Sequence, residues 1–492
     1  MNDAILPYMF HIFWALFLGF GLITSFKSSW KAEHEQKNVL SSAKNDTVIF
    51  LDPLIFPLCI LIYMGVCVLL SGWENSQQFL FSLLTDLFFF ITLYFSLLLL
   101  LLPFLRKRYT ARTCATFWLI PVFLFYQPNV VYSSFALPTK AVFYVPSFGA
   151  GLLFLIWLAG FVIIFLLQIL SHLRFSRMMR RHSQPVEDPV LLEIWKHCKR
   201  DLNIGDLTRP LMLRYSSLIR TPLTIGMYRT NWVTYLPKRP FSPEEAELIF
   251  SHELHHIQRH DTHTKFFLSF CTALGWPHPL VWLAVKKAKE DLELSCDEIV
   301  LKNADRETRK KYAELLLTSA GDSRGYTTCL SASAKTLRYR LNATITQKQR
   351  RLGLGLLLLS MILSCFSIGN FALTTERESI ANLAEINNLS IREAGFLPEG
   401  TQDDGQYIPL SDTSALSRYL NSLEIERFLT LYNEDPHLKG PCISGVFETT
   451  DQSFFLTASC LTVYDVVDHE LTKEQYHVCT PIDWEYVQSL QA

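Results

Sequence analysis

The chain has 492 residues, enough for more than one domain. Hydrophobic residues make up 49% of it and charged residues only 18%, which excludes an ordinary soluble protein and indicates a membrane protein. The net charge of −1 excludes nothing by itself, but 11 scattered cysteines without a CxxC pair exclude a disulfide scaffold and a zinc ribbon.

Apolar runs divide the chain. Five of them approach the ~20 residues that a membrane-spanning helix needs. They lie at about 5–26, 48–71, 79–105, 148–170 and 352–374. A shorter run at about 115–132 contains Pro121 and is ambiguous by itself.

Four clusters of Lys and Arg flank these runs. They are Lys27, Lys31 and Lys37; Arg106, Lys107, Arg108 and Arg112; Arg174, Arg177, Arg180 and Arg181; and Lys348, Arg350 and Arg351. The positive-inside rule places all four on the cytoplasmic side of a membrane. The second and third clusters can share a side only if the chain crosses twice between them, so 115–132 should also span. The sequence therefore predicts six transmembrane helices, both termini outside, and a cytoplasmic stretch from about 172 to 351.

One further apolar stretch, 266–285, is interrupted by Gly275-Trp276-Pro277-His278-Pro279. Proline inside a helix removes a hydrogen bond and clashes with the preceding turn. A span here would also put 252–256 and 290–298 on opposite faces of the membrane. We therefore expect a helical hairpin packed on or beside the bilayer.

Residues 251–256 read Ser-His-Glu-Leu-His-His and contain the HExxH pattern. On a helix, His252 and His256 share a face and can bind one tetrahedral ion, and Glu253 then reaches a metal-activated water as general base. Ser242, Pro243 and Glu245 predict the start of this helix as N-cap, first helical residue and capping-box partner. His255 could also approach a metal, but we expect it to be solvated or membrane-facing, because His256 leaves Glu253 correctly placed.

A catalytic zinc takes three protein ligands and leaves the fourth position to water. The third candidate lies within residues 290–298, which read Glu-Asp-Leu-Glu-Leu-Ser-Cys-Asp-Glu and are expected to be helical. Glu293 and Asp297 share a face, so one can bind the metal while the other orients a ligand histidine. Spacing alone does not choose between Glu290, Glu293 and Asp297. Cys296 could be a soft ligand, although a buried cysteine is the more common case.

These motifs together resemble the membrane zinc peptidases of the BlaR/MecR type, which act as β-lactam-sensing antirepressors. The matching segments are 221–226, Leu236-Pro237, 242–245, 252–256, Arg259, Asp261, 276–282, 291–298, Tyr312-Ala313 and Leu315-Leu316, within about 145–375. The resemblance implies one Zn²⁺ ion with a catalytic water, bound by His252, His256 and Glu293. It also implies Glu253 as catalytic base and Asp297 as support for a ligand.

The resemblance completes the predicted architecture, a mainly α membrane protein with a cytoplasmic α+β zincin-like metallopeptidase domain and a small extracellular α+β C-terminal domain. We expect a five-helix transmembrane region at 1–171, the peptidase at 172–351, the last transmembrane helix at 352–374 and a sensor domain at 375–492. Within the sensor domain we expect a polar helix at 376–397 and strands at 444–450 and 454–467. Cys442, Cys460 and Cys479 could supply one disulfide there.

The family's β-lactam sensors end in a larger penicillin-binding domain with a serine nucleophile in an SxxK motif, and residues 375–492 contain no SxxK. We therefore expect the family's peptidase with a different extracellular sensor, whose ligand or partner is unknown.

The function we predict is a signal-transducing zinc metalloendopeptidase that cleaves itself, a cytoplasmic repressor of the winged-helix type, or both. The other partner is the lipid bilayer; a homodimer is compatible with the sequence, and no direct contact with nucleic acid is expected. Two alternatives stay open, a housekeeping membrane zinc protease and a non-catalytic membrane receptor. Glu253 argues against the receptor, since a structural zinc site needs no base.

Overall fold

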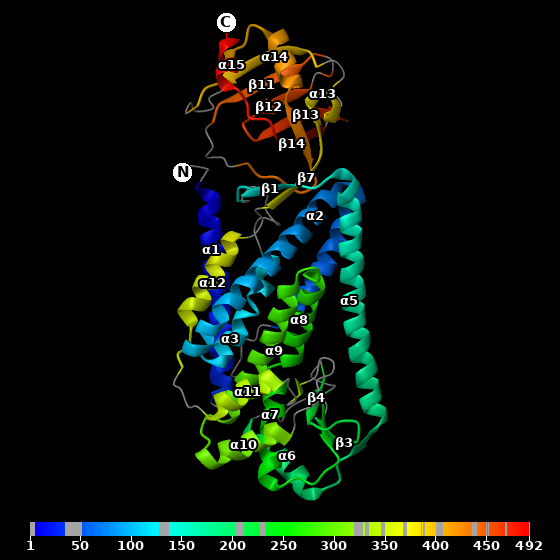
Figure 1. The fold of residues 1–492 in the computed structure, drawn as a ribbon, viewed down its shortest axis with the longest axis vertical. Coiled ribbons are helices and arrows are strands. Elements are labelled where there is room, and N and C mark those ends of the chain that lie inside the picture. The colour runs from blue at the N-terminus through cyan, green and yellow to red at the C-terminus, as the bar shows by residue number, and fades with distance from the viewer. Residues whose placement is uncertain are drawn as a thin grey trace.

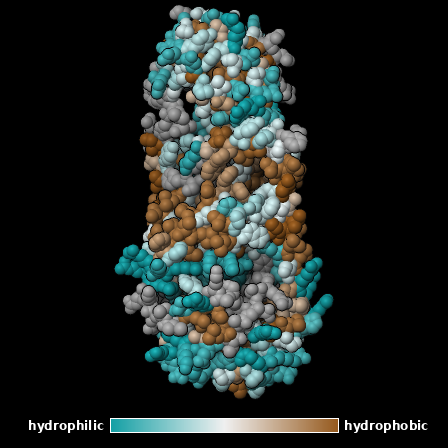
Figure 2. All heavy atoms as spheres, viewed as in Figure 1, coloured by the Kyte–Doolittle hydropathy of each residue, from teal (hydrophilic) through white to brown (hydrophobic). Residues whose placement is uncertain are grey.

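The chain forms three tiers along one long axis (Figure 1). A β-rich C-terminal domain lies at one end, long helices fill the middle, and a helical domain with a small sheet lies at the other end. The middle tier carries most of the hydrophobic surface in Figure 2. This computed structural model describes residues 5–34, 52–126, 137–202, 204, 211–226, 232–318, 328–329, 334–345, 350–367, 371–384, 386, 389–399, 407–434, 440–448, 450, 452–467 and 470–491.

Long apolar helices dominate the middle tier. They are α1 (Leu6–His34), α2 (Ile55–Arg108) and α5 (Ser147–Arg181). Within the described residues, Leu6–Lys31, Ser76–Arg108 and Gly151–Arg181 are each long and apolar enough to cross a membrane. Leu152, Ile163 and Leu167 on α5 are each more than half exposed, as expected for side chains that face lipid.

The remaining predicted spans coincide with shorter apolar helices, Ile55–Leu70, Ala111–Phe123 and Leu354–Cys365. The first of these is the opening part of α2, which is kinked at Gly72, where φ is 76°. The second combines α3 (Ala111–Phe117) with the 3-10 helix η1 (Ile120–Tyr126), and the rest of the predicted 115–132 span lies outside the described residues. The arrangement of six spans stays a prediction.

The predicted helix at 352–374 is wrong at its C-terminal end. Helix α12 (Leu354–Ser367) is followed by strand β7 (Phe371–Ser379). Strand β7 pairs in parallel with β1 (Ala141–Tyr144), which precedes α5, and Ala141 lies opposite Phe371. Pairing with a segment more than 200 residues away converts the end of an apolar run into a strand, which no local pattern could indicate.

The basic clusters lie at the end of the helices that carries the small sheet. Arg106, in the last turn of α2, forms an ion pair with Asp291 at 2.7 Å, and Arg112 forms one at 3.2 Å with Glu33 near the end of α1. A β-bridge joins Tyr109 to Arg351, and the end of α5 leads directly into the small sheet. The described members of all four clusters therefore share one end of the molecule, as the sequence predicted.

In its described residues, the domain at this end combines a five-stranded sheet with six helices. The strands are β2 (Ser183–Pro185), β3 (Met212–Ser216), β4 (Leu223–Ile225), β5 (Val233–Pro237) and β6 (Thr328–Cys329), in the order β2-β3-β5-β4-β6. The helices are α6 (Pro189–Asp201), α7 (Pro243–Gln258), α8 (Asp261–Leu274), α9 (Pro279–Val300), α10 (Arg306–Thr318) and α11 (Ala334–Ile345). Trp195 packs edge-on against Phe250 at 5.1 Å in its core.

Helices α8 and α9 form the hairpin expected from the Gly-Trp-Pro-His-Pro break. Helix α8 packs inside the helix bundle, and the position of the hairpin on or beside the bilayer stays a prediction. The ring of Phe267 lies 5.4 Å from that of Phe56 on α2, and Phe270 lies 5.8 Å from Phe161 on α5. Gly160 on α5 lets the ring of Trp276 pack closely against this helix, since a Cβ there would lie only 2.3 Å from the ring.

The C-terminal domain is built on a nine-stranded sheet in the order β1-β7-β10-β14-β13-β12-β11-β8-β9. Besides β1 and β7, its strands are β8 (Ile391–Leu397), β9 (Ile408–Pro409), β10 (Glu424–Phe428), β11 (Cys442–Phe447), β12 (Ser453–Leu456), β13 (Cys460–Val467) and β14 (Glu470–Val478). Three short helices accompany the sheet, α13 (Ile380–Leu383), α14 (Thr413–Asn421) and α15 (Trp484–Ser489). Its apolar core includes Leu416, Ile425 and Phe447, each fully buried.

The predicted helix at 376–397 is wrong, because β7, the one-turn helix α13 and β8 occupy this stretch. Polar residues favour a helix locally here, but β7 pairs with β10 and β8 pairs with β11. The predicted strands at 444–450 and 454–467 are confirmed in outline as β11, β12 and β13. The structure contains no disulfide among Cys442, Cys460 and Cys479.

Candidate metal centre

Helix α7 begins as its sequence predicts. Ser242 is the N-cap and accepts a hydrogen bond from the Glu245 backbone N–H at 3.1 Å, and Pro243 occupies the first turn. The Glu245 carboxylate does not complete a capping box but pairs with Arg239 at 2.5 Å. From this start, His252 and His256 lie on the face of α7 that points into the domain interior, and neither side chain is exposed.

The two histidines and Glu293 bring three donor atoms together. The Nε2 atoms of His252 and His256 lie 3.1 Å apart. Helix α9 brings Glu293 Oε2 to 3.6 Å from the first and 3.7 Å from the second. Donor atoms bound about 2.0–2.2 Å from one tetrahedral ion lie roughly 3.3–3.6 Å from each other. The triangle therefore fits a single tetrahedral metal ion.

Glu293 has the charge state that a metal ligand needs. Burial raises the pKa of its carboxyl, but Lys265 and the two histidines outweigh burial, and the pKa lies well below its usual range. Lys265 Nζ donates to Oε1 at 3.0 Å, whereas the buried Oε2 accepts no hydrogen bond from the described residues. The ionised Oε2 faces two imidazole nitrogens, lies 3.5 Å from Arg340 Nη1, and is suited to bind a cation.

Glu290 and Asp297, the alternatives to Glu293, point to other partners. Glu290 pairs with Lys287 at 2.7 Å and with Arg106 at 3.5 Å. Asp297 accepts two hydrogen bonds from the buried Arg340 guanidinium, at 2.6 and 2.7 Å. Neither carboxylate occupies the space between the two Nε2 atoms.

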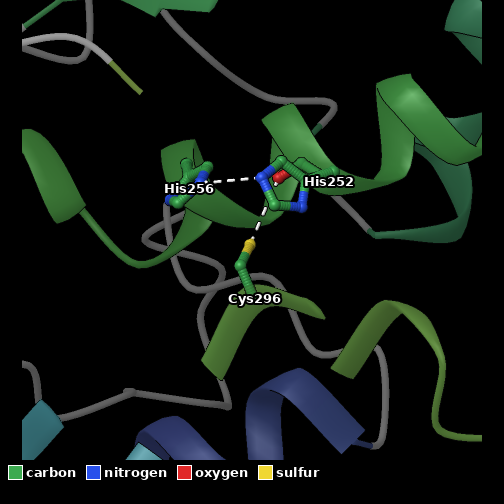
Figure 3. Close-up of side chains that lie close together, drawn as sticks. All are labelled: His252, His256 and Cys296. Carbon is green, nitrogen blue, oxygen red and sulfur yellow. Dashed lines mark hydrogen bonds between the residues drawn. The ribbon is translucent and has the colours of Figure 1, made fainter. Parts of the chain in front are cut away.

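Cys296 also lies close to His252 and His256 (Figure 3). Its thiol donates to the backbone oxygen of His252 at 3.3 Å. Burial raises the pKa of this thiol, and the nearby His256 and Arg259 only partly offset that effect. Cys296 would have to lose its proton to bind a metal, whereas Glu293 is already ionised and places Oε2 opposite both Nε2 atoms.

Glu253 faces the sheet beside the histidines and is fully buried. Its Oε2 accepts a hydrogen bond from Thr224 Oγ1 on β4 at 2.7 Å. Thr224 Oγ1 in turn lies 2.9 Å from Thr234 Oγ1 on β5. Two adjacent strands therefore hold the orientation of this carboxylate.

Each histidine has a partner at its other ring nitrogen. His256 Nδ1 lies 2.7 Å from Asp261 Oδ2. His252 Nδ1 lies 2.9 Å from the Tyr312 hydroxyl, which donates to Asp297 Oδ1 at 2.6 Å, and 3.5 Å from Asp297 itself. Asp297 thus acts on His252 mainly through Tyr312, and Asp261 holds His256 directly. Such contacts fix the tautomer and orientation of ligand histidines.

A buried ion network connects this centre to the long helices. Arg259, at the end of α7, lies 3.7 Å from Asp261 Oδ1 and 3.6 Å from Glu33 Oε1 on α1. Its guanidinium also donates to Ser295 on α9. Burial raises the pKa of Asp261, but Arg259 and His256 outweigh burial and lower the pKa to about 2. Asp261 therefore stays ionised beside His256.

Sequence reasoning missed several of these residues. Lys265 and Arg340 were not singled out, because a lone basic residue carries no motif. Asp261 and Tyr312 were noted only as part of a family resemblance. The expectation that His255 is solvated or membrane-facing is wrong, because only 4% of it is exposed.

Comparison with known proteins identifies this part of the chain. Residues 136–343 match the family model described as BlaR1 peptidase M56. They belong to the BlaR/MecR-type M56 peptidase family. The match runs from before β1 into α11, so it covers every residue of the candidate metal centre, and of the described strands of the C-terminal sheet it includes β1 alone.

Curated relatives of the same type share this segment. The Regulatory protein BlaR1 of Bacillus licheniformis is 31% identical over 189 residues, which is 38% of this chain and 30% of the relative. The Methicillin resistance mecR1 protein of Staphylococcus aureus is 25% identical over 169 residues, 34% of this chain and 28% of the relative. The chain thus covers less than a third of the length of these relatives.

Proposed function

We propose that the chain is a membrane zinc metalloendopeptidase. The observation that carries this proposal is the triangle of His252, His256 and Glu293 donor atoms, with Glu253 held beside it by Thr224. Two imidazoles and one carboxylate with an open fourth position are the donor set of catalytic zinc sites in metalloproteases. A zinc ion bound there would polarise a peptide carbonyl and lower the pKa of a water molecule.

In this proposal Glu253 is the general base. Its carboxylate takes a proton from the attacking water and passes it to the nitrogen of the leaving amine. Thr224 and Thr234 hold the carboxylate in place. Asp261, Tyr312 and Asp297 fix the two histidines, and Lys265 keeps Glu293 ionised. In this proposal Asp297 is not a metal ligand. It supports His252 through Tyr312 and is itself held by Arg340.

Two substitutions test this chemistry. Glu253→Gln should keep the zinc content of the purified protein and abolish cleavage of a peptide substrate, whereas His256→Ala should lose the zinc ion of this centre and also abolish cleavage. Glu247→Gln, an exposed position on the same helix, is the matched control and should change neither. Normal proteolysis by the Glu253→Gln variant would contradict the mechanism.

We further propose that this peptidase faces the cytoplasm and that residues 375–492 form an extracellular sensor domain. The support is the placement of all four basic clusters at the peptidase end, because such clusters favour the cytoplasmic side of a membrane. The substrate would be the chain itself, a cytoplasmic repressor, or both, in line with the family, and the extracellular signal would be a ligand or partner of the C-terminal domain. Lipid surrounds the middle tier, and no contact with nucleic acid is proposed.

A signalling role is favoured over a housekeeping protease because a chain of contacts connects the C-terminal domain to the metal centre. Strand β7 of the C-terminal domain follows α12, α12 packs along α1, and Glu33 near the end of α1 reaches Arg259 beside the metal centre. A signal that shifts α12 can therefore change the surroundings of His256 through contacts that already exist. The shift needs about 1.4 kcal/mol of coupling for each tenfold change in activity.

Cysteine labelling tests the orientation. Lys310→Cys on α10 and Ser414→Cys on α14 place exposed thiols on the two end domains. In intact cells an impermeant maleimide should label the second and spare the first, and both should react after the cells are opened. Labelling of the first position alone in intact cells would refute the orientation.

A further inference from the structure

Asp52, His260 and His263 form a second cluster of metal-binding side chains outside the candidate metal centre. Asp52 lies just before α2, and the two histidines lie where α7 turns into α8. His263 Nδ1 is 2.9 Å from both oxygens of Asp52. One ligand atom from each residue lies within 4.8 Å of the other two.

His260 has an unusual backbone conformation. Its φ of 54° and ψ of 40° place it in the left-handed region, which is unfavourable for a residue with a Cβ atom. Among the described residues only one other non-glycine residue, Glu376, has a positive φ. The turn brings the His260 ring to 5.0 Å from that of His263. Strained backbone of this kind is concentrated at functional sites.

The surroundings of the cluster suit a bound cation. Both histidines are buried, at 9% and 4% exposed, whereas the Asp52 side chain is 27% exposed. An ion can therefore reach the cluster from the Asp52 side and then be largely enclosed. Two imidazoles with one carboxylate are donors that Zn²⁺ and its first-row neighbours accept.

We propose that Asp52, His260 and His263 bind a second divalent transition-metal ion, with Zn²⁺ as the ion of choice. This site shares no ligand with His252, His256 and Glu293. The ion would link the segment before α2 to the junction of α7 and α8. Occupancy of this site would therefore hold the peptidase domain against a long apolar helix. The proposal does not depend on the proposed proteolysis.

Metal counting on the full chain tests the site. Purified protein is equilibrated with excess Zn²⁺, desalted and analysed by elemental mass spectrometry. We expect two ions per wild-type chain and one in His263→Ala and in Asp52→Asn, the latter chosen because it keeps the shape of the side chain. His197→Ala is the matched control, because His197 and Asp201 form an exposed histidine–aspartate pair without a third donor, and it should retain two ions.

The candidate metal centre is counted separately with His256→Ala. We expect one ion in this variant and none when it is combined with Asp52→Asn. A wild-type count of one that falls to zero in His256→Ala and is unchanged in His263→Ala would overturn the second site and leave the proposed function intact. A count of one that is lost only in His263→Ala would support the second site and contradict the catalytic one.

A second readout does not depend on stoichiometry. In the His256→Ala background, Zn²⁺ should raise the midpoint of thermal unfolding by mass action, because it binds the folded state. Adding Asp52→Asn should remove this rise, provided that circular dichroism shows the same fold. A rise that persists unchanged in the double variant would overturn the proposal.

Discussion

The two end domains differ in what they bury. The peptidase end encloses a dense set of ionised and polar groups around His252 and His256, among them Glu293, Lys265 and Arg340. The C-terminal domain encloses an apolar core, and its most buried carboxylate, Glu426, is already held by Arg377 and Thr374. Burying charge opposes folding unless every group is paired. The folded state of the peptidase end therefore depends more on the pairing of buried charges than that of the C-terminal domain does.

The largest effect should come from removing one buried charge at the peptidase end. Arg340→Met leaves the Asp297 carboxylate unpaired in the interior, which typically costs about 3–5 kcal/mol. We expect a marked fall in the thermal unfolding midpoint and loss of metal. Arg338→Met on the exposed side of the same helix is the control. Equal midpoints for the two variants would show that the buried network is not needed for stability.

In the C-terminal domain a comparable loss should come from an apolar residue. Leu416→Ala on α14 opens a cavity in a closed core and should cost about 2–5 kcal/mol. Hydrogen exchange should then rise in β10 and α14, with no change in metal content, because this domain contributes no residue to the metal centre. Ser414→Ala on the exposed face of α14 should leave exchange unchanged. Loss of metal in Leu416→Ala would instead mean that the two ends fold as one unit.

A smaller effect is expected from Tyr312→Phe. This change removes the hydroxyl that links Asp297 to His252 but keeps the ring in the core. Loss of such a supporting contact typically weakens metal binding roughly 10–100-fold. Competition with a chelator of known affinity measures the change. An unchanged zinc affinity would assign Tyr312 to packing alone.

The smallest effect, none, is expected from a labelled penicillin. Covalent capture needs a serine activated by a nearby lysine. Ser411, Ser414 and Ser417 have no lysine three residues later, and Ser411 Oγ donates instead to the Leu490 backbone oxygen. Incubating the full chain with fluorescent penicillin should give no adduct by mass spectrometry. A stoichiometric, site-specific adduct in the C-terminal domain would mean that the sensor has been misread.

The local part of the metal centre could be predicted from sequence. Residues four apart on a helix share a face, so the HExxH pattern already places His252 beside His256. The choice of Glu293 over Glu290 and Asp297 could not be made from spacing, since it depends on which carboxylate faces the histidines. Lys265, Arg340 and Asp261 reach the centre from other helices, and no local pattern links them to it.

The errors in the fold prediction also arise from contacts between residues that are far apart in the sequence. Residues 376–397 look helical because their local composition is polar, but pairing with β10 and β11 makes most of them strands. The apolar run at 352–374 ends early because Phe371 pairs with Ala141. The hairpin of α8 and α9 was predicted from its prolines, whereas its packing inside the bundle depends on contacts with Phe56 and Phe161. Non-local contacts decide each case.

The assignment of His252, His256 and Glu293 as metal ligands is tested most directly by zinc-edge X-ray absorption. The measurement uses the His263→Ala variant, in which only the candidate metal centre should bind zinc. The account predicts a first shell of nitrogen and oxygen only, at about 2.0–2.2 Å, since His252, His256 and Glu293 would be the protein ligands. Glu293→Gln should weaken binding, and Cys296→Ser should leave the spectrum unchanged. A sulfur neighbour at about 2.3 Å that disappears in Cys296→Ser would contradict the claim and make Cys296 the third ligand.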